Sequence, residues 1–137
     1  MKKVILTPNP YRDKGFHTAR TAMKILQRAG LDVQLCLPFE VDRSYDLPRD
    51  LRFSKLEREL PNSECVICFG GDGTILHMAK AATRNDIPIL GVNIGTMGFM
   101  AELESTELSQ LARLAEGDFS LDRRMMLDVT VRRDRDI

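Results

Sequence analysis

Hydrophobic residues along the chain follow two patterns that alternate with each other. Short apolar runs, or runs in which every second residue is apolar, are typical of β-strands. Runs of this kind occupy residues 3–7, 31–37, 64–69 and 87–92. Apolar residues spaced three and four positions apart are typical of amphipathic helices. This spacing predicts helices at residues 16–29, 74–83 and 105–115, and a short helix is also predicted at residues 51–60.

Strands that alternate with helices predict a parallel sheet covered by helices on both faces. The run at residues 64–69 is apolar on both of its faces, which is typical of a central strand in such a sheet. Gly30 and Gly117 are expected to end the first and last helices, and Ser105 is expected to cap the last one. The predicted fold class is therefore α/β.

The end of the chain has a different pattern. Within residues 125–133, Leu127 and Val129 alternate with polar residues. This alternation predicts a half-buried strand with one solvated face, and a lone strand needs partners. We interpret it as the first strand of a second, all-β domain that is otherwise missing. The predicted domains are therefore residues 1–122 and residues 123–137.

Glycine-bearing loops follow the third and fourth predicted strands, at residues 70–74 and 93–99, and the first strand leads into a loop at residues 8–13. The carboxyl ends of parallel strands lie at one edge of the sheet, where ligands of α/β proteins bind. The sequence therefore predicts a ligand site built from these loops.

The turn at residues 70–74 reads Gly-Gly-Asp-Gly-Thr and lies between a buried strand and a helix. Glycines let the backbone approach a ligand closely, and the N–H groups that begin a helix can bind an anion. Asp72 is the only ionisable residue of the turn. It either takes part in the chemistry, as a base or a metal ligand, or caps the helix that follows. Thr74 either donates to a phosphate or caps the helix, and we expect the cap.

Lys and Arg together number 20, as do Asp and Glu, so the formal net charge at pH 7 is zero. This balance gives no electrostatic reason to expect nucleic acid or a membrane as a partner. Arg123, Arg124, Arg132 and Arg133 form a basic cluster, which we interpret as a solvated strand face. No apolar segment is long enough to span a membrane, and Pro8 ends the first apolar run too early for a signal peptide. We therefore expect a cytoplasmic protein.

Cys65 and Cys68 form a C-x-x-C pattern, which occurs in redox and zinc sites. Both cysteines lie in a predicted strand, where positions three apart point to opposite faces of the sheet. We therefore interpret them as buried, reduced core residues.

Residues 70–76 read Gly-Gly-Asp-Gly-Thr-Ile-Leu, and residues 91–100 read Gly-Val-Asn-Ile-Gly-Thr-Met-Gly-Phe-Met. In order and spacing, these segments resemble the two N-terminal motifs of NAD kinases. The loop at residues 8–13 resembles the first loop of bacterial members. Lipid kinases and phosphofructokinases share similar glycine–aspartate loops, whereas the second motif points to NAD kinase. The resemblance covers nearly the whole chain but only the N-terminal part of the family's length.

The resemblance implies a Rossmann-like parallel sheet flanked by helices, followed by the start of a C-terminal β domain. It also implies transfer of a phosphoryl group from ATP or polyphosphate to the adenosine 2′-hydroxyl of NAD, which gives NADP. Mg²⁺ is expected to bridge the donor phosphates rather than to sit in a cage of protein ligands. The implied partners are small-molecule nucleotides, and a homo-oligomer, dimer or tetramer, is expected for the full-length protein.

Asp72 matches the family's catalytic aspartate, which is proposed to accept the proton of the 2′-hydroxyl. Gly71 and Gly73 are expected to allow close approach of the substrates. His77 either reaches the dinucleotide or lies on an exposed helix face. Asn93 follows a strand end, where its amide can bind a ligand or fix a turn.

Two further candidate residues have alternative interpretations. Phe99 either stacks on adenine or packs in the core. Arg12 either holds the phosphate donor or is a solvated loop residue.

Two other functions stay open at this point. A lipid kinase of the diacylglycerol or sphingosine type predicts an apolar groove for the acceptor. A nucleotide-binding fragment without turnover is the third reading, because the family's Asn-Glu or Asn-Asp motif would follow residue 137.

Overall fold

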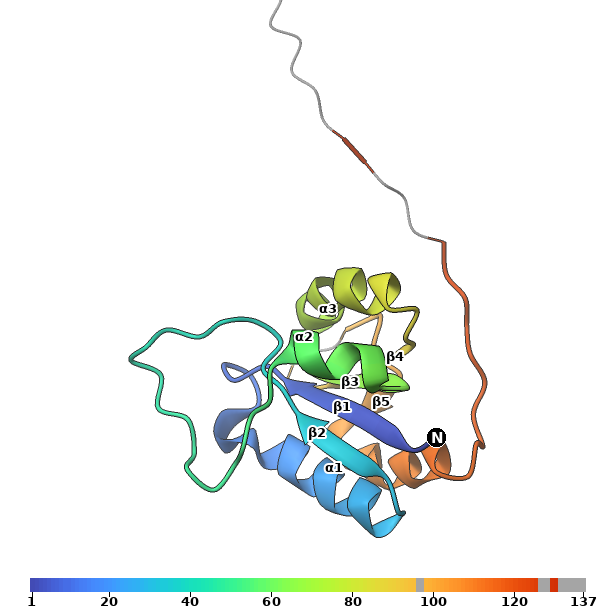
Figure 1. Ribbon diagram of the computed structural model, residues 1–137, viewed down its shortest axis with the longest axis horizontal. Coiled ribbons are helices and arrows are strands. Elements are labelled where there is room, and N and C mark those ends of the chain that lie inside the picture. The colour runs from blue at the N-terminus through green and yellow to red at the C-terminus, as the bar shows by residue number, and fades with distance from the viewer. Residues whose placement is uncertain (96–97, 126–128, 131–137) are drawn as a thin grey trace, which may run out of the picture.

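The computed structural model describes residues 1–95, 98–125 and 129–130. Its centre is a five-stranded sheet in the order β2-β1-β3-β4-β5, in which all neighbouring strands are parallel (Figure 1). The strands are β1 (Lys3–Pro8), β2 (Asp32–Leu35), β3 (Cys65–Gly70), β4 (Ile89–Asn93) and β5 (Leu103–Glu104). The predicted α/β class with a parallel, Rossmann-like sheet is confirmed.

Helices cover both faces of this sheet, as Figure 1 shows. One face carries α1 (His17–Arg28) and the 3₁₀ helix η3 (Ser105–Leu114). The other face carries α3 (Asp72–Arg84) and α2 (Leu56–Glu59). The remaining short 3₁₀ turns are η1 (Lys14–Phe16), before α1, and η2 (Leu60–Asn62), after α2.

The two faces of the sheet have separate hydrophobic cores, because successive residues of a strand point to opposite sides. Val4 and Leu6 of β1 pack into the core beneath α1 and η3. Ile5, between them, packs into the core beneath α3. All residues of β3 are buried, which agrees with the prediction of a central strand.

The cysteines of β3 are divided between these two cores. Cys65 belongs to the core beneath α1, and Cys68 belongs to the core beneath α3. Burial raises the pKa of the Cys65 thiol to about 12 and that of the Cys68 thiol to about 11. Burial likewise raises the pKa of Cys36 to about 12. The interpretation of Cys65 and Cys68 as core residues is confirmed.

The direction in which strands are added to the sheet reverses between β1 and β3. The chain moves outward from β1 to β2 on one side, and β3, β4 and β5 follow on the other side. Loops that leave the carboxyl ends of β1 and β3 therefore diverge, and the crevice between diverging loops is where ligands of such folds bind.

Several element boundaries differ from those that the sequence predicts. β2 ends at Leu35, because the chain beyond it makes only an isolated bridge between Cys36 and Ser54. α2 begins at Leu56, five residues later than predicted, and the segment before it has no regular structure. The sequence does not predict β5, because two residues are too few to show a period.

The last helix differs from its prediction in type and in its cap. It is a 3₁₀ helix, and its N-cap is Glu104 instead of Ser105. The Glu104 side chain accepts the N–H group of Glu107, while the N–H group of Glu104 donates to Glu107 Oε1 at 2.9 Å. This capping box satisfies N–H groups at the helix start, so the predicted serine cap was wrong.

The strand predicted at residues 125–133 lies largely outside the described residues, and residues 118–125 and 129–130 belong to no helix or strand. The division into domains at residues 1–122 and 123–137 stays a prediction. Arg123 and Arg124 are exposed, as expected for a solvated face. Among the described residues, no helix has the length and apolar character needed to cross a membrane.

Candidate active site

A cavity of about 460 Å³ opens at the carboxyl ends of the strands. The residues that line it follow four different strands: Asn9, Arg12, Phe39, Gly71, Asp72, Gly73, Thr74, His77 and Gly98. The structure therefore brings together the loops after β1, β2, β3 and β4. Five predicted site residues lie in this lining, namely Arg12, Gly71, Asp72, Gly73 and His77. We call it the strand-end cavity.

The glycines after β3 serve two different purposes. A Cβ atom on Gly70 would lie 2.5 Å from Thr74 Oγ1, so packing requires glycine at this position. A Cβ atom on Gly71 or Gly73 would meet nothing within 4 Å. Those two glycines leave their backbone open to the cavity, which is what close approach of a ligand needs.

Helix α3 begins at this turn without a side-chain cap. Its N-cap is Gly71, whose carbonyl oxygen accepts the N–H groups of Thr74 at 3.1 Å and Ile75 at 3.3 Å. The N–H groups of Asp72 and Gly73, in the first turn, belong to residues that line the cavity. The start of a helix carries partial positive charge, so this end of α3 is suited to an anion.

Thr74 does not cap the helix, contrary to the prediction. It is buried within the first turn, and its Oγ1 accepts a hydrogen bond from Asn9 Nδ2 at 3.0 Å. Asn9 also uses its Oδ1 to accept the N–H group of Tyr11 at 3.0 Å. These bonds join the loop after β1 to the turn after β3.

Asp72 does not cap its own helix, because its carboxylate is bonded to the loop after β4. Oδ1 accepts the N–H groups of Phe99 at 3.2 Å and Met100 at 3.1 Å, and Oδ2 accepts that of Phe99 at 3.1 Å. A Cβ atom on Gly98 would lie only 2.6 Å from Asp72 Oδ1. Glycine at this position therefore lets the loop approach the carboxylate.

Asn93, at the end of β4, is buried beside this loop and does not line the cavity. Its Nδ2 donates to Glu104 Oε2 at 3.2 Å. Its Oδ1 has no hydrogen-bond partner among the described residues. A buried oxygen without a partner is uncommon in folded proteins, and a bound water or ligand often explains it.

Phe39 and His77 contribute an aromatic pair to the lining of the cavity. Their ring centroids are 5.7 Å apart, and the rings meet edge to face. Phe39 also stacks with Tyr11 at 6.0 Å, and the hydroxyl of Tyr45 donates to the carbonyl of Pro10 at 2.7 Å. Sequence reasoning missed Phe39, because it lies in an aperiodic segment after β2 and belongs to no motif.

The two remaining candidate residues are exposed. Arg12 lines the cavity, and its Nη1 is 3.5 Å from the point where a Cβ on Gly95 would lie. Phe99 is 91% exposed, so the core-packing alternative for it is wrong. Its ring does not line the strand-end cavity, although its N–H group binds Asp72.

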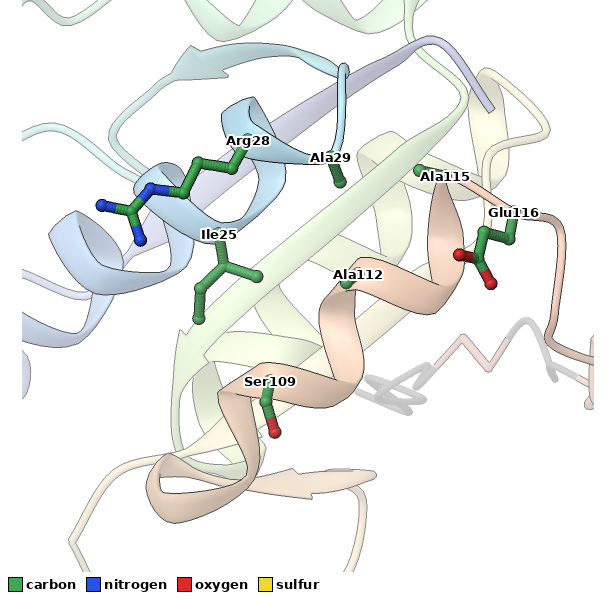
Figure 2. Close-up of a pocket in the computed structure, with 7 residues that line it drawn as sticks. All are labelled: Ile25, Arg28, Ala29, Ser109, Ala112, Ala115 and Glu116. Carbon is green, nitrogen blue, oxygen red and sulfur yellow. The ribbon is translucent and has the colours of Figure 1, made fainter.

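A second cavity lies between α1 and η3, on the sheet face that these helices cover (Figure 2). Its volume is also about 460 Å³. The lining residues are Ile25, Arg28, Ala29, Ser109, Ala112, Ala115 and Glu116. In Figure 2 the Arg28 side chain extends away from Glu116. No predicted site residue lines this helix-face cavity.

Among the described residues, no cluster of three or more His, Cys, Asp or Glu side chains could hold a metal ion. Asp72 is the only carboxylate among the described residues that line the strand-end cavity.

Comparison with known proteins gives a consistent result. Residues 4–119 match the family described as the ATP-NAD kinase N-terminal domain. The chain is 35% identical over 136 residues to the NAD kinase of Lachnoclostridium phytofermentans, an alignment that covers 96% of this chain and 44% of the relative. It is 37% identical over 139 residues to that of Natranaerobius thermophilus, covering 98% and 46%.

A third relative, the NAD kinase of Mycolicibacterium paratuberculosis, is 34% identical over 142 residues, covering 96% of this chain and 46% of the relative. The chain thus spans about half the length of the curated relatives that it matches. The family match includes the turn with Asp72 and the loop with Gly98, which meet in the strand-end cavity. This chain therefore belongs to the ATP-NAD kinase family.

Proposed function

We propose that the strand-end cavity is the phosphoryl-transfer site of an NAD kinase. In this reaction the 2′-hydroxyl of the adenosine ribose of NAD attacks the terminal phosphorus of the donor. The bond from that phosphorus to its bridging oxygen breaks, so that NADP forms and ADP or a polyphosphate shortened by one phosphate leaves. The observation that carries the proposal is the position of Asp72, whose carboxylate lies in the cavity beside the uncapped start of α3.

Asp72 is proposed to accept the proton of the attacking hydroxyl. An ionised carboxylate has room for about four hydrogen bonds, and Asp72 Oδ2 accepts one, from Phe99. A further bond from a substrate hydroxyl is therefore available. The bonds from Phe99 and Met100 fix the direction of the carboxylate, and a fixed direction favours proton transfer.

The donor phosphates are proposed to bind at the backbone of Gly71 and Gly73 and at the Arg12 guanidinium. Phosphoryl transfer depends mainly on alignment and on neutralising charge, which N–H groups at a helix start and a cation supply. Mg²⁺ bound to the donor would neutralise further phosphate charge. The donor is ATP or polyphosphate, and both fit a site that binds phosphates.

The NAD side of the reaction is assigned to the surrounding polar and aromatic residues. His77, exposed beside Phe39, is proposed to contact the dinucleotide. Phe99, because its ring is exposed, is proposed to stack on a base. Asn93 is proposed to bind a substrate group through its free oxygen. The lipid kinase alternative is less well supported, because Phe39 is the only large apolar side chain among the described residues of the lining.

Because the chain is similar to curated NAD kinases, we also propose that the protein is cytoplasmic. We further propose that its full-length form assembles into a homodimer or a homotetramer. Light scattering on the purified protein measures the assembly directly. A monomer at all concentrations would contradict this part of the proposal.

The proposed reaction is tested by following NADP formation from NAD and Mg²⁺ with ATP or with polyphosphate as donor. Replacing Asp72 by Asn removes the base without changing the size of the side chain. We expect turnover to fall by about 10²–10⁴-fold, the range for loss of a general base. The matched control is Asp86→Asn, which neutralises an exposed carboxylate after the far end of α3, at a positive φ that Asn tolerates.

Equal turnover by the unaltered chain and the Asp72→Asn variant would contradict the role of Asp72. Tight NAD binding without turnover would support a nucleotide-binding unit and not a kinase. An unaltered chain that neither binds NAD nor forms NADP would contradict the proposed function as a whole.

A further inference from the structure

The Asn93 amide has one orientation that its surroundings allow. Glu104 Oε2 lies 3.2 Å from Asn93 Nδ2, and an ionised carboxylate can only accept hydrogen bonds. The NH₂ group must therefore face Glu104. The carbonyl oxygen, Oδ1, consequently points the other way, and it is the atom that has no hydrogen-bond partner within residues 1–95, 98–125 and 129–130.

The position of Gly98 shows what this free oxygen faces. A Cβ atom built on Gly98 would lie 2.6 Å from Asp72 Oδ1 and 3.6 Å from Asn93 Oδ1. The position of this Cβ atom is thus close to both the Asp72 carboxylate and the free amide oxygen of Asn93. Both of these groups are hydrogen-bond acceptors. Asn93 is 3% exposed, so bulk water does not satisfy its oxygen. A donor group placed there would remove the cost of leaving this buried oxygen unpaired.

Two further contacts, one of its side chain and one of its backbone, hold Glu104 in place. It is the N-cap of η3, where its side chain accepts the N–H group of Glu107. Its backbone also pairs with Asn93 across β4 and β5. The carboxylate that orients the amide is therefore anchored by the helix start and by the sheet edge.

We propose that Glu104 is a positioning residue of this site: it holds the Asn93 amide so that Oδ1 accepts a hydrogen bond from a ribose hydroxyl of the nucleotide bound beside Asp72. The proposal rests on the proposed function, because it requires the strand-end cavity to bind NAD. Glu104 lies outside both glycine motifs and outside the cavity lining, and it acts on the nucleotide only through Asn93.

The test compares NAD binding by calorimetry for the full 137-residue chain and its variants. We expect Asn93→Ala and Glu104→Ala each to weaken NAD binding about tenfold, the effect of losing one well-formed hydrogen bond. The double variant should bind no more weakly than Asn93→Ala, because both changes remove the same contact. Glu104→Gln should restore most of the affinity, since its Oε1 still accepts the amide.

The control separates this role from helix capping. Glu107→Ala breaks the reciprocal half of the capping box and leaves the Glu104–Asn93 bond in place. Thermal unfolding should show a loss of stability in both Glu104→Ala and Glu107→Ala, whereas only Glu104→Ala should lose NAD affinity. Equal affinity losses in these two variants would overturn the proposal and make Glu104 a structural cap.

Two further results have distinct meanings. If Asn93→Ala and Glu104→Ala lower stability and bind NAD like the unaltered chain, an ordered water occupies the free oxygen and the proposal is overturned while the proposed function stands. If the unaltered chain does not bind NAD, the proposed function fails, and this inference fails with it.

Discussion

The strand-end cavity and the helix-face cavity have the same volume, about 460 Å³, and different walls. The first is lined by strand-end loops and by the start of α3, with glycine backbone, a carboxylate, a guanidinium and an imidazole. The second is lined mostly by small side chains on α1 and η3 and just after their last residues. Within helices the backbone groups bond to each other, so a helix face offers a ligand only its side chains. Strand-end loops and the first turn of a helix offer backbone N–H groups as well. Cavity volume alone would not distinguish these two places.

The largest effect that tests this contrast is expected from Gly98→Ala. The added methyl group would clash with Asp72 Oδ1, so the loop must move and its bonds to the carboxylate must lengthen. We expect NADP formation to fall by roughly 10²-fold, and the free energy of unfolding to fall by about 1–3 kcal/mol. Steady-state kinetics and urea unfolding measure the two effects.

The matched variant for this change is Gly73→Ala, where a methyl group meets nothing within 4 Å. Its free energy of unfolding should stay unchanged or rise by about 0.5–1 kcal/mol, because alanine is the better helix residue. Similar losses of stability in the two variants would break the distinction between a glycine required by packing and one that leaves room for a ligand.

Raising the pH is expected to lower the free energy of unfolding by a smaller amount. This loss of stability should affect the two sides of the sheet, and hence the surroundings of both cavities, at the same time. The ordinary pKa of a thiol is 9.0, whereas burial holds that of Cys65 at about 12 and that of Cys68 at about 11. Above pH 9 the unfolded chain therefore binds fewer protons than the folded one. Stability is fully present below pH 9 and should fall between pH 9 and 11, by about 1 kcal/mol per pH unit for each thiol.

Urea unfolding at a series of pH values measures this slope, and Cys68→Ala should make it shallower. These cysteines lie on opposite faces of β3, one in each core. A probe in either cavity should therefore report the same transition. Separate transitions for the two sheet faces would contradict the unfolding of both cores as one cooperative unit.

The smallest effect is expected from Ala112→Leu, which adds bulk to the wall of the helix-face cavity. Because the space there is already open, the free energy of unfolding should change by no more than about 0.5 kcal/mol. NAD affinity measured by calorimetry should be unchanged. A clear loss of NAD affinity would show that the helix-face cavity matters to the site, and the contrast drawn above would be wrong.

Much of the fold could be predicted because its central elements are long and strongly patterned. β1 and β3 are continuous apolar runs, and α1 and α3 show regular helical spacing. The predictions failed where an element is too short to show a hydrophobic period, or where a contact between side chains determines the structure. β5 has two residues, and the cap of η3 depends on a reciprocal pair of glutamates.

The site could be predicted where its residues belong to a motif, as with Asp72 and Gly73. The hydrogen bonds within the site could not be predicted. The partners of Asp72 and Thr74 lie in other loops, and the sequence does not show where these loops lie in space. The cap predicted for Thr74 is a local bond, and a long-range bond from Asn9 replaces it. Phe39 and Glu104 carry no local signal, and only the folded sheet brings them near the cavity.

The pairing of β1 with β3 has a consequence for the order of events during folding. Thr7 of β1 donates its hydroxyl to the carbonyl of Ile67 in β3, across 60 positions of the sequence. Contacts between such distant segments form slowly, because a long loop must close before they contribute stability. The strand-end cavity lies at this junction, so no early folding intermediate built from local contacts can contain it. The proposed binding of a nucleotide should therefore become possible only when the sheet is complete.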